Sequence, residues 1–136
     1  MRDIREFSPI VLAYIGDAVY ELYMRTKMVD EGIAFNIKDL HSDVASRVNA
    51  GAQARALARI EPILSEEEWE VVRRGRNAKG RRGPASARVT DYRRSTGFEA
   101  LLGHLYLTQR YDRLLELMRV ATGEDSGDGG CQGERS

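Results

Sequence analysis

The chain has 136 residues, of which 42% are apolar and 31% are charged, as is usual for a single folded domain with one hydrophobic core. No apolar run reaches the roughly 18 to 20 uncharged residues that a membrane-spanning helix needs, and no signal-peptide core follows the charged N-terminus. The single cysteine, Cys131, lacks a partner for an internal disulfide or a metal site, so we expect a reducing cytoplasm.

The first predicted helix begins at Ser8 and Pro9, because serine caps a helix and proline suits its first turn. It is expected to run to about residue 29 and to end near Gly32. On its exposed side, Glu21 and Arg25 have the spacing of a helical ion pair.

Helical spacing also predicts which face of this helix is buried. The residues on that face are Ile10, Ala13, Gly16 or Asp17, Tyr20 and Met24. Asp17 is therefore expected at or near the buried stripe, where a carboxylate must be paired, hydrogen-bonded or bound to a metal. Gly16 beside it indicates that a ligand or another helix approaches the backbone closely.

The second helical region begins at Asn36 or Asp39 and covers about residues 38–59, with Gly51 as the expected break between two helices. A lone histidine in this region, His41, is interpreted as a surface or core residue rather than a ligand. The next helix follows a capping box formed by Ser65 and Glu68.

A concentrated basic segment follows. Of the 21 basic and 21 acidic residues, nine bases and one acid lie between Val72 and Arg94, which leaves 12 bases and 20 acids elsewhere. Such a segment on an acidic body suits phosphate binding, because arginine grips phosphate with two parallel hydrogen bonds. Residues 78–91 show no periodicity and are interpreted as an exposed loop that contacts nucleic acid, with a simple solvated linker as the alternative.

Two further helices complete the predicted fold. One carries Glu99 and covers about residues 94–108, and the last covers residues 111–121. The remainder from Gly123 has almost no apolar residue and is expected to be disordered. No strand-like alternation is present, so the predicted fold class is all-α.

Two carboxylates lie in similar apolar stretches that contain glycine, Asp17 beside Gly16 and Glu99 in the stretch that ends at Gly103. If the two helices pack together, these acids repel each other unless a cation lies between them. A hard cation such as Mg²⁺ suits oxygen ligands. The alternative is two ordinary amphipathic helices whose acids pair with Arg25 and other bases.

Residues 14–21 (YIGDAVYE) resemble the signature helix of ribonuclease III catalytic domains, and residues 98–103 (FEALLG) resemble their second acidic helix. The resemblance is strongest to the Mini-ribonuclease III branch, for which residues 74–79 (RGRNAK) and 92–101 (YRRSTGFEAL) are also typical. It extends over about residues 9–118, and several motifs in the same order make it specific.

The resemblance implies an all-α ribonuclease III catalytic domain over residues 1–122, followed by a polar tail over residues 123–136. It also implies a homodimer whose signature helices meet across a two-fold axis, with Ala13, Gly16 and Tyr20 as close-contact residues. The implied activity is endonucleolytic cleavage of double-stranded RNA that leaves 5′-phosphate and 3′-hydroxyl ends.

In that reading Asp17 and Glu99 are the catalytic residues and hold Mg²⁺, or Mn²⁺ in its place. The RNA-binding residues are expected to be Arg74, Arg76, Asn77, Lys79, Arg81 and Arg82. The implied substrate is the precursor of large-subunit (23S) ribosomal RNA, with a ribosomal protein as a further expected helper.

The chain departs from full-length ribonuclease III enzymes at two positions that carry acids there and are Ile10 and Thr96 here. The Mini-ribonuclease III branch shares this trait, which leaves the number of ions open. Glu21 is expected to pair with Arg25 rather than to assist the site. No double-stranded-RNA-binding domain is expected after Met118, so the catalytic domain must grip RNA through its own shape and phosphate contacts.

Two other functions remain open from the residues alone. The first is a non-catalytic RNA-binding helical dimer of the same fold that acts in ribosome assembly. The second is a helical protein-interaction module with no role in RNA binding. The retention of both Asp17 and Glu99 favours the nuclease over the first of these.

Overall fold

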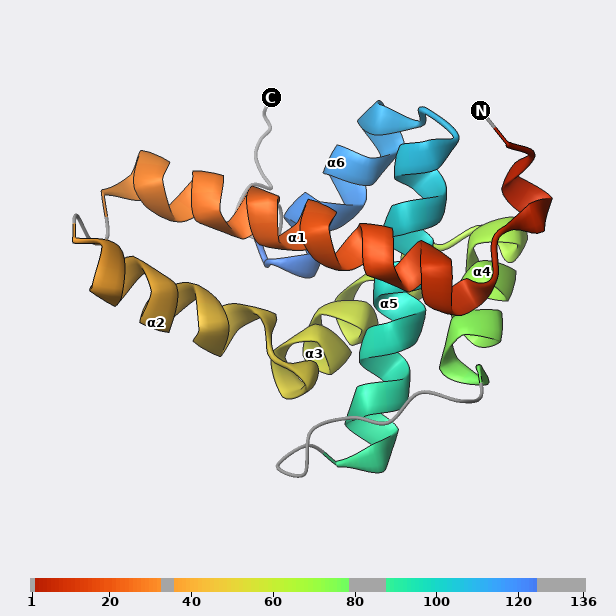
Figure 1. The fold of residues 1–136 in the computed structure, drawn as a ribbon, viewed down its shortest axis with the longest axis horizontal. Helices are drawn as coiled ribbons and strands as arrows, with labels where there is room; N and C mark the ends of the chain where they lie inside the picture. Colours follow the sequence, from red (N-terminus) through yellow and green to blue (C-terminus); the bar gives the residue numbers. More distant parts are fainter. Residues whose placement is uncertain (1, 33–35, 79–87, 125–136) are drawn as a thin grey trace.

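A computed structural model describes residues 2–32, 36–78 and 88–124, and all regular secondary structure in these residues is helical, as predicted. The elements in chain order are η1 (Ile4–Glu6), α1 (Pro9–Glu31), α2 (Ile37–Val48), α3 (Ala50–Ile60), η2 (Glu61–Ile63), α4 (Glu66–Arg76), α5 (Val89–Leu107) and α6 (Tyr111–Ala121). Figure 1 shows α1 lying across α5, with α2 and α3 on one side and α6 on the other. Among the described helices, none is long and apolar enough to cross a membrane.

Several helix ends lie where the capping residues predict them. The Ser8 hydroxyl accepts a hydrogen bond from the Val11 amide at 3.2 Å, and Gly32 ends α1 with a left-handed φ of 66°. The predicted capping box at the start of α4 is present, because Ser65 and Glu68 each accept a hydrogen bond from the other's backbone amide.

Two predicted boundaries are wrong. The break between α2 and α3 falls at Asn49, whose side chain accepts a hydrogen bond from the Ala52 amide at 2.9 Å, and Gly51 lies inside α3. The Asn49 side chain caps the first turn of α3 by this hydrogen bond, and a glycine within a helix has no side chain that could form one. Helix α5 begins at Val89, ahead of the expected start near residue 94.

The core forms around α5, whose residues Ser95 to Gly103 are all buried. Phe98 is fully buried and packs edge-on against Tyr20 of α1, with 5.0 Å between ring centroids. Fully burying a side chain of this size stabilises the fold by about 1.5–3 kcal/mol, and an edge-on aromatic pair adds about 0.5–1.5 kcal/mol.

Glycine allows α4 to approach α5 closely. A Cβ added at Gly75 of α4 would lie 2.9 Å from the Gly97 Cα, and one added at Gly97 would lie 2.6 Å from the Val72 carbonyl oxygen. These distances are too short for side chains. The α4–α5 contact therefore requires glycine, and it places the basic end of α4 beside α5.

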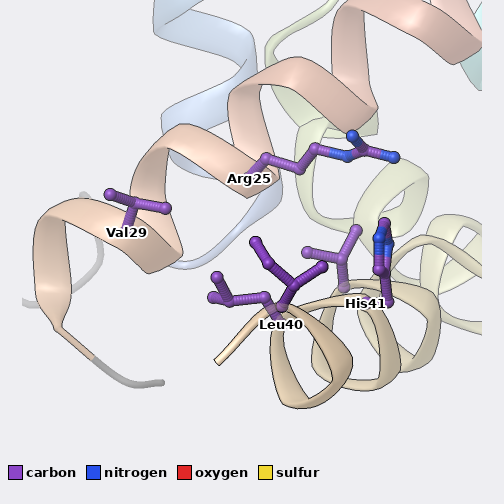
Figure 2. Close-up of a pocket in the computed structure, with 6 residues that line it drawn as sticks. Arg25, Val29, Leu40 and His41 are labelled. Atoms are coloured by element: carbon purple, nitrogen blue, oxygen red, sulfur yellow. The ribbon is translucent and has the colours of Figure 1, made fainter. Parts of the chain in front are cut away.

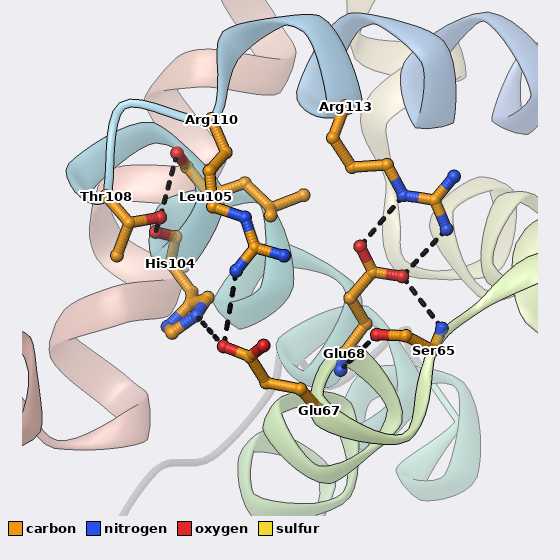
Figure 3. A network of polar contacts seen from close by, with 8 residues as sticks. All are labelled: Ser65, Glu67, Glu68, His104, Leu105, Thr108, Arg110 and Arg113. Carbon is orange, nitrogen blue, oxygen red and sulfur yellow. Dashed lines mark hydrogen bonds and ion pairs between the residues drawn. The ribbon is translucent and has the colours of Figure 1, made fainter.

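A buried ion pair joins α4 to α6 (Figure 3). The Glu68 side chain is 2% exposed, and its two carboxylate oxygens accept hydrogen bonds from the Arg113 Nε and Nη2 atoms, each at 2.8 Å. The Arg113 guanidinium holds the pKa of the Glu68 carboxyl at about 2, well below its usual range. Beside this pair, Glu67 of α4 lies 3.2 Å from the Arg110 guanidinium and 3.5 Å from His104 Nε2.

Candidate active site

The crossing of α1 and α5 brings the two predicted acidic stretches into backbone contact. A Cβ added at Gly16 would lie 1.7 Å from the Glu99 carbonyl oxygen, and one added at Gly103 would lie 1.9 Å from the Leu12 carbonyl oxygen. The backbones of the two helices therefore touch at these glycines. The expectation that another helix approaches Gly16 is confirmed, and the residue that follows it, Asp17, lies beside the turn of α5 that carries Glu99.

The structure corrects the expected burial of Asp17. Ala13, Gly16, Tyr20 and Met24 form the buried face of α1 as predicted, but Asp17 is exposed. Each residue of an α-helix is rotated by about 100° from the one before it, so Asp17 turns away from the line on which Gly16 meets α5. Among the described residues, none forms a hydrogen bond or ion pair with the Asp17 carboxylate.

Glu99 has the opposite environment. It is only 6% exposed, and its Oε2 atom accepts a hydrogen bond from the Gln53 Nε2 atom of α3 at 3.2 Å. Gln53 is 1% exposed, and the same Nε2 atom donates to the Val48 carbonyl at 3.0 Å. The Gln53 amide is thus held from the α2–α3 junction and directed at the Glu99 carboxylate.

Gln53 was not predicted as a site residue. A weak signal is present in the sequence, because Gln53 is a polar residue at the helical spacing of buried Ala56, Leu57 and Ile60 on α3. Its Oε1 atom is buried and has no hydrogen-bond partner among the described residues. A buried amide oxygen without a partner is costly, so this atom is suited to accept a hydrogen bond from a group that enters the site.

Ile10 and Thr96, the two neutral residues at positions where full-length ribonuclease III enzymes carry acids, are both at least half-buried. Thr96 is 4% exposed and its hydroxyl donates to the Tyr92 carbonyl at 3.0 Å, while Ile10 is half-buried at the start of α1. Glu21 forms the predicted ion pair with Arg25. Within the described residues, no group of three or more histidine, cysteine, aspartate or glutamate side chains is close enough to hold an ion.

The predicted RNA-binding residues that the structure describes lie at the C-terminal end of α4. Arg74 and Asn77 are exposed, and Asn77 is the C-cap of the helix. The Arg76 guanidinium lies over the Trp69 ring, 5.7 Å from its centroid, which restricts where its charge can point. The other three predicted residues, Lys79, Arg81 and Arg82, lie outside the described residues, as does the tail from residue 125.

An exposed apolar stripe runs along the outer face of α1. Val11, Tyr14, Leu22 and Val29 are 42%, 75%, 66% and 59% exposed. Next to its end, Val29 and Arg25 line an apolar cleft of about 190 Å³ with Leu40 and His41 of α2 (Figure 2).

This stripe lies on a different face of α1 from the residues that were expected to meet a partner subunit. Ala13, Gly16 and Tyr20 are buried against the chain's own α5, so that expectation is wrong. The reason is that α1 has two apolar faces, and the sequence does not say which of them is covered by the chain itself.

Comparison with known proteins places the chain in a family. A family model described as the ribonuclease III domain matches residues 10–110. The Mini-ribonuclease 3 of Symbiobacterium thermophilum is 47% identical over 113 residues, which cover 83% of this chain and 86% of that protein. The Mini-ribonuclease 3 of a Thermoanaerobacter species is 47% identical over 118 residues, or 87% and 82% of the two chains.

The fold agrees with this result. A crystal structure of a protein from Fusobacterium nucleatum matches with a TM-score of 0.79 and 30% sequence identity, over 92% of this chain and 99% of that one. Both the sequence and the arrangement of helices are therefore shared over most of the chain. The chain belongs to the ribonuclease III family, in its Mini-ribonuclease III branch, and is an endoribonuclease.

Proposed function

We propose that this endoribonuclease cleaves double-stranded RNA at a site formed by Asp17 and Glu99. The observation that carries the proposal is the contact between Gly16 and the Glu99 carbonyl, because it joins the two acid-bearing helices at the level of these residues. In a helical protein of this family, two carboxylates at one helix crossing are suited to phosphodiester hydrolysis, which depends on cations and an activated water.

The residues present fit Mg²⁺, with Mn²⁺ as a substitute, as the ion of this site. Both acids supply oxygen ligands, Asp17 is exposed, and the buried Gln53 Oε1 atom lacks a partner beside Glu99. Mg²⁺ commonly uses one or two carboxylates and keeps several waters, so two acids suffice. When bound, such an ion activates water and neutralises the charge that develops on the phosphate.

The chain's own residues position these groups. Gln53 holds one oxygen of Glu99 and thereby sets the direction in which the other oxygen faces. The exposure of Asp17 leaves its carboxylate open to solvent and to a bound substrate. Gly16 and Gly103 keep the backbones of the two helices at contact distance at the level of the two acids.

RNA would be gripped by the basic end of α4, that is by Arg74, Arg76 and Asn77 together with Lys79, Arg81 and Arg82. Exposed Arg74 and half-buried Arg76 lie at a helix end beside α5, and duplex RNA is recognised mainly through phosphates and 2′-hydroxyls. We propose that the domain covers residues 1–122, that residues 123–136 form a polar tail, and that the protein acts in the cytoplasm.

The exposed stripe of α1 supports a homodimer. Val11, Tyr14, Leu22 and Val29 present large apolar side chains to solvent along one helix. A contiguous exposed apolar surface of this kind marks an interaction site, and a second copy of the same helix across a two-fold axis is its simplest partner. The dimer would then carry two sites, one for each strand of the duplex.

The resemblance to Mini-ribonuclease III supports the precursor of 23S ribosomal RNA as the substrate, with a ribosomal protein as helper. The alternative is a non-catalytic RNA-binding dimer of this fold, and cleavage itself distinguishes the two.

The test is incubation of a long RNA duplex with the protein in Mg²⁺ and, separately, in excess chelator. We expect fragments with 5′-phosphate ends in Mg²⁺ only. Asp17→Asn and Glu99→Gln should each lower the cleavage rate at least about a hundredfold, because a metal contributes several kcal/mol to the transition state. Asp112→Asn, which removes an exposed acid of α6, is the matched control and should cleave normally.

Circular dichroism and light scattering would show that each variant remains folded and keeps its oligomeric state. Full activity in either Asp17→Asn or Glu99→Gln would reject the assignment of these two acids. Intact RNA in Mg²⁺ with a clear gel shift would favour the non-catalytic alternative.

A further inference from the structure

A polar cleft of about 220 Å³ lies between α1, α2, α3 and the end of α6, and four basic side chains line it. Lys27 comes from α1, Arg47 from α2, and Arg55 and Arg59 from α3. None of these belongs to the basic segment between Val72 and Arg94. The cleft is therefore a second concentration of positive charge, formed by residues that are far apart in the sequence.

Two of the four cations, Lys27 and Arg59, are held by contacts within the chain. The Arg59 Nη1 atom donates to the Ala121 carbonyl at the end of α6, at 2.7 Å. A guanidinium carries five N–H donors, more than this one bond uses. The Lys27 side chain is only 17% exposed and lies 2.6 Å from the Glu31 carboxylate. Both residues line the cleft while their side chains are fixed by contacts within the chain.

Acids do not offset this charge fully. Of the acids that the structure describes near the cleft, Glu31 is bound by Lys27 and interacts with Arg47, and Glu124 accepts hydrogen bonds from Tyr23 and Thr122. Gathering several cations around one cleft raises the free energy of the empty state, because like charges repel each other. A bound anion removes this cost.

Hydroxyl groups complete the lining. Ser46, Thr122 and Tyr20 each contribute to the wall of the cleft. Burial raises the pKa of Tyr20 to about 12, against the opposing effect of Arg59, so its hydroxyl stays protonated. Arginine and lysine, with the neutral Tyr20 hydroxyl beside them, are groups that bind phosphate oxygens.

We propose that this cleft binds a phosphate group, at a site separate from Asp17 and Glu99. The two sites are neighbours along α3, because Ala52 lines the cleft and Gln53 donates to Glu99. Tyr20 likewise lines the cleft and packs against Phe98, the residue before Glu99. The phosphate comes either from the backbone of a bound RNA or from a free phosphate compound.

The first arm of the test uses inorganic phosphate without any divalent cation, so it does not depend on the proposed nuclease function. Amide resonances of the ¹⁵N-labelled full chain are followed during titration, with sodium chloride at matched ionic strength as the reference. We expect saturable shifts in residues 46–59 and 121–122. The Arg47→Gln/Arg55→Gln variant should bind phosphate at least about tenfold more weakly, since each charge-assisted hydrogen bond contributes more than a neutral one.

The Arg2→Gln/Arg5→Gln variant loses the same charge from exposed N-terminal positions and should bind phosphate like the wild type. Absence of saturable shifts in the wild type overturns the proposal without reference to any variant. Equal affinity in the Arg47/Arg55 variant, or shifts confined to the end of α4, overturns it as well.

The second arm identifies the source of the phosphate. Binding of an RNA duplex is measured in excess chelator, so that no cleavage occurs. If the RNA backbone supplies the phosphate, the Arg47/Arg55 variant binds duplex more weakly with a shallower salt dependence, and inorganic phosphate competes with the duplex. If duplex binding is unchanged while phosphate binding is lost, the ligand is a free phosphate compound, and the site itself is supported in both cases.

Discussion

At the scale of single residues, the candidate site depends on how one buried carboxylate is held. Glu99 is 6% exposed within the buried stretch of α5, and Gln53 offers it an amide donor. Loss of a neighbour that orients a metal ligand typically lowers metal affinity or activity by about 10- to 100-fold. Gln53 is thus a positioning residue for the proposed reaction.

We expect Gln53→Leu to raise the Mg²⁺ concentration needed for half-maximal cleavage by about tenfold or more. Leucine has a similar volume but leaves the Glu99 carboxylate without this donor. The measurement is the cleavage rate at saturating RNA over a series of Mg²⁺ concentrations. A variant that is less stable to heat but has the wild-type Mg²⁺ dependence would mean that Gln53 serves the core alone.

At the scale of elements, glycine decides how α1 meets α5. Gly16 and Gly103 each lie against a backbone carbonyl of the other helix, at distances that no side chain tolerates. Gly51 provides the opposite case, since a Cβ added there would meet nothing closer than 3.5 Å. Gly16 and Gly51, which both lie within helices, therefore form a matched pair for comparison.

Gly16→Ala should destabilise the fold by about 3 kcal/mol or more, because the helices must separate and leave their packed contacts. Gly51→Ala should be neutral or stabilising by up to about 1 kcal/mol, because alanine favours the helix and its methyl group would make only ordinary van der Waals contacts. Urea denaturation of both variants checks this. Equal stability of the two would show that the α1–α5 contact is looser than described.

The ion pair between α4 and α6 makes stability depend on pH. Arg113 lowers the pKa of the Glu68 carboxyl to about 2 from an ordinary value of 4.5. A lowered pKa in the folded state means that the stabilisation is complete above the unfolded value and is lost as the pH falls through the folded one. The shift corresponds to about 3 kcal/mol.

We therefore expect the free energy of unfolding to fall between about pH 5 and pH 2, and Glu68→Gln to remove about 3 kcal/mol of that pH dependence. Glu116→Gln is the control, because Glu116 also pairs with Arg113 but is 56% exposed. Urea denaturation at several pH values gives the comparison. The assignment fails if the two variants keep the same pH dependence as the wild type.

At the scale of the whole molecule, charge is unevenly distributed on a chain whose formal net charge is zero. Replacing Arg76, Lys79, Arg81 and Arg82 with alanine should weaken duplex binding and reduce its salt dependence, by about 0.7 to 0.9 in slope for each lost phosphate contact. Filter binding at several salt concentrations measures this slope. The control variant loses the same charge outside the basic segment, by replacement with alanine of Arg2, Arg5, Lys38 and Arg119. An equal loss of slope in both variants would mean that the segment acts only through net charge.

The proposed dimer is a second property of the whole molecule. Leu22 is 66% exposed at the middle of the apolar stripe on α1, so Leu22→Glu should convert a dimer into a 15.3 kDa monomer. Leu115→Glu introduces the same charge at an exposed leucine of α6 and should leave the dimer intact. Light scattering coupled to gel filtration measures the mass. A wild-type monomer would reject the dimer.

The sequence by itself determined the elements and the family. Helix ends follow local rules, so Ser8, Gly32 and the Ser65–Glu68 capping box could be interpreted without any long-range contact. The same holds for the motifs around Asp17 and Glu99, because a family signature is a property of the order of residues. Comparison with known proteins confirmed that part of the prediction.

Only the tertiary structure decided which face of each helix is covered. Periodicity marks apolar faces but does not say what packs on them, so Asp17 was expected to be buried and Tyr20 to be available to a partner subunit. The structure exposes the first and buries the second against Phe98. Gln53 beside Glu99, and the cations of the α1–α3 cleft, come together through long-range packing, which no local pattern encodes.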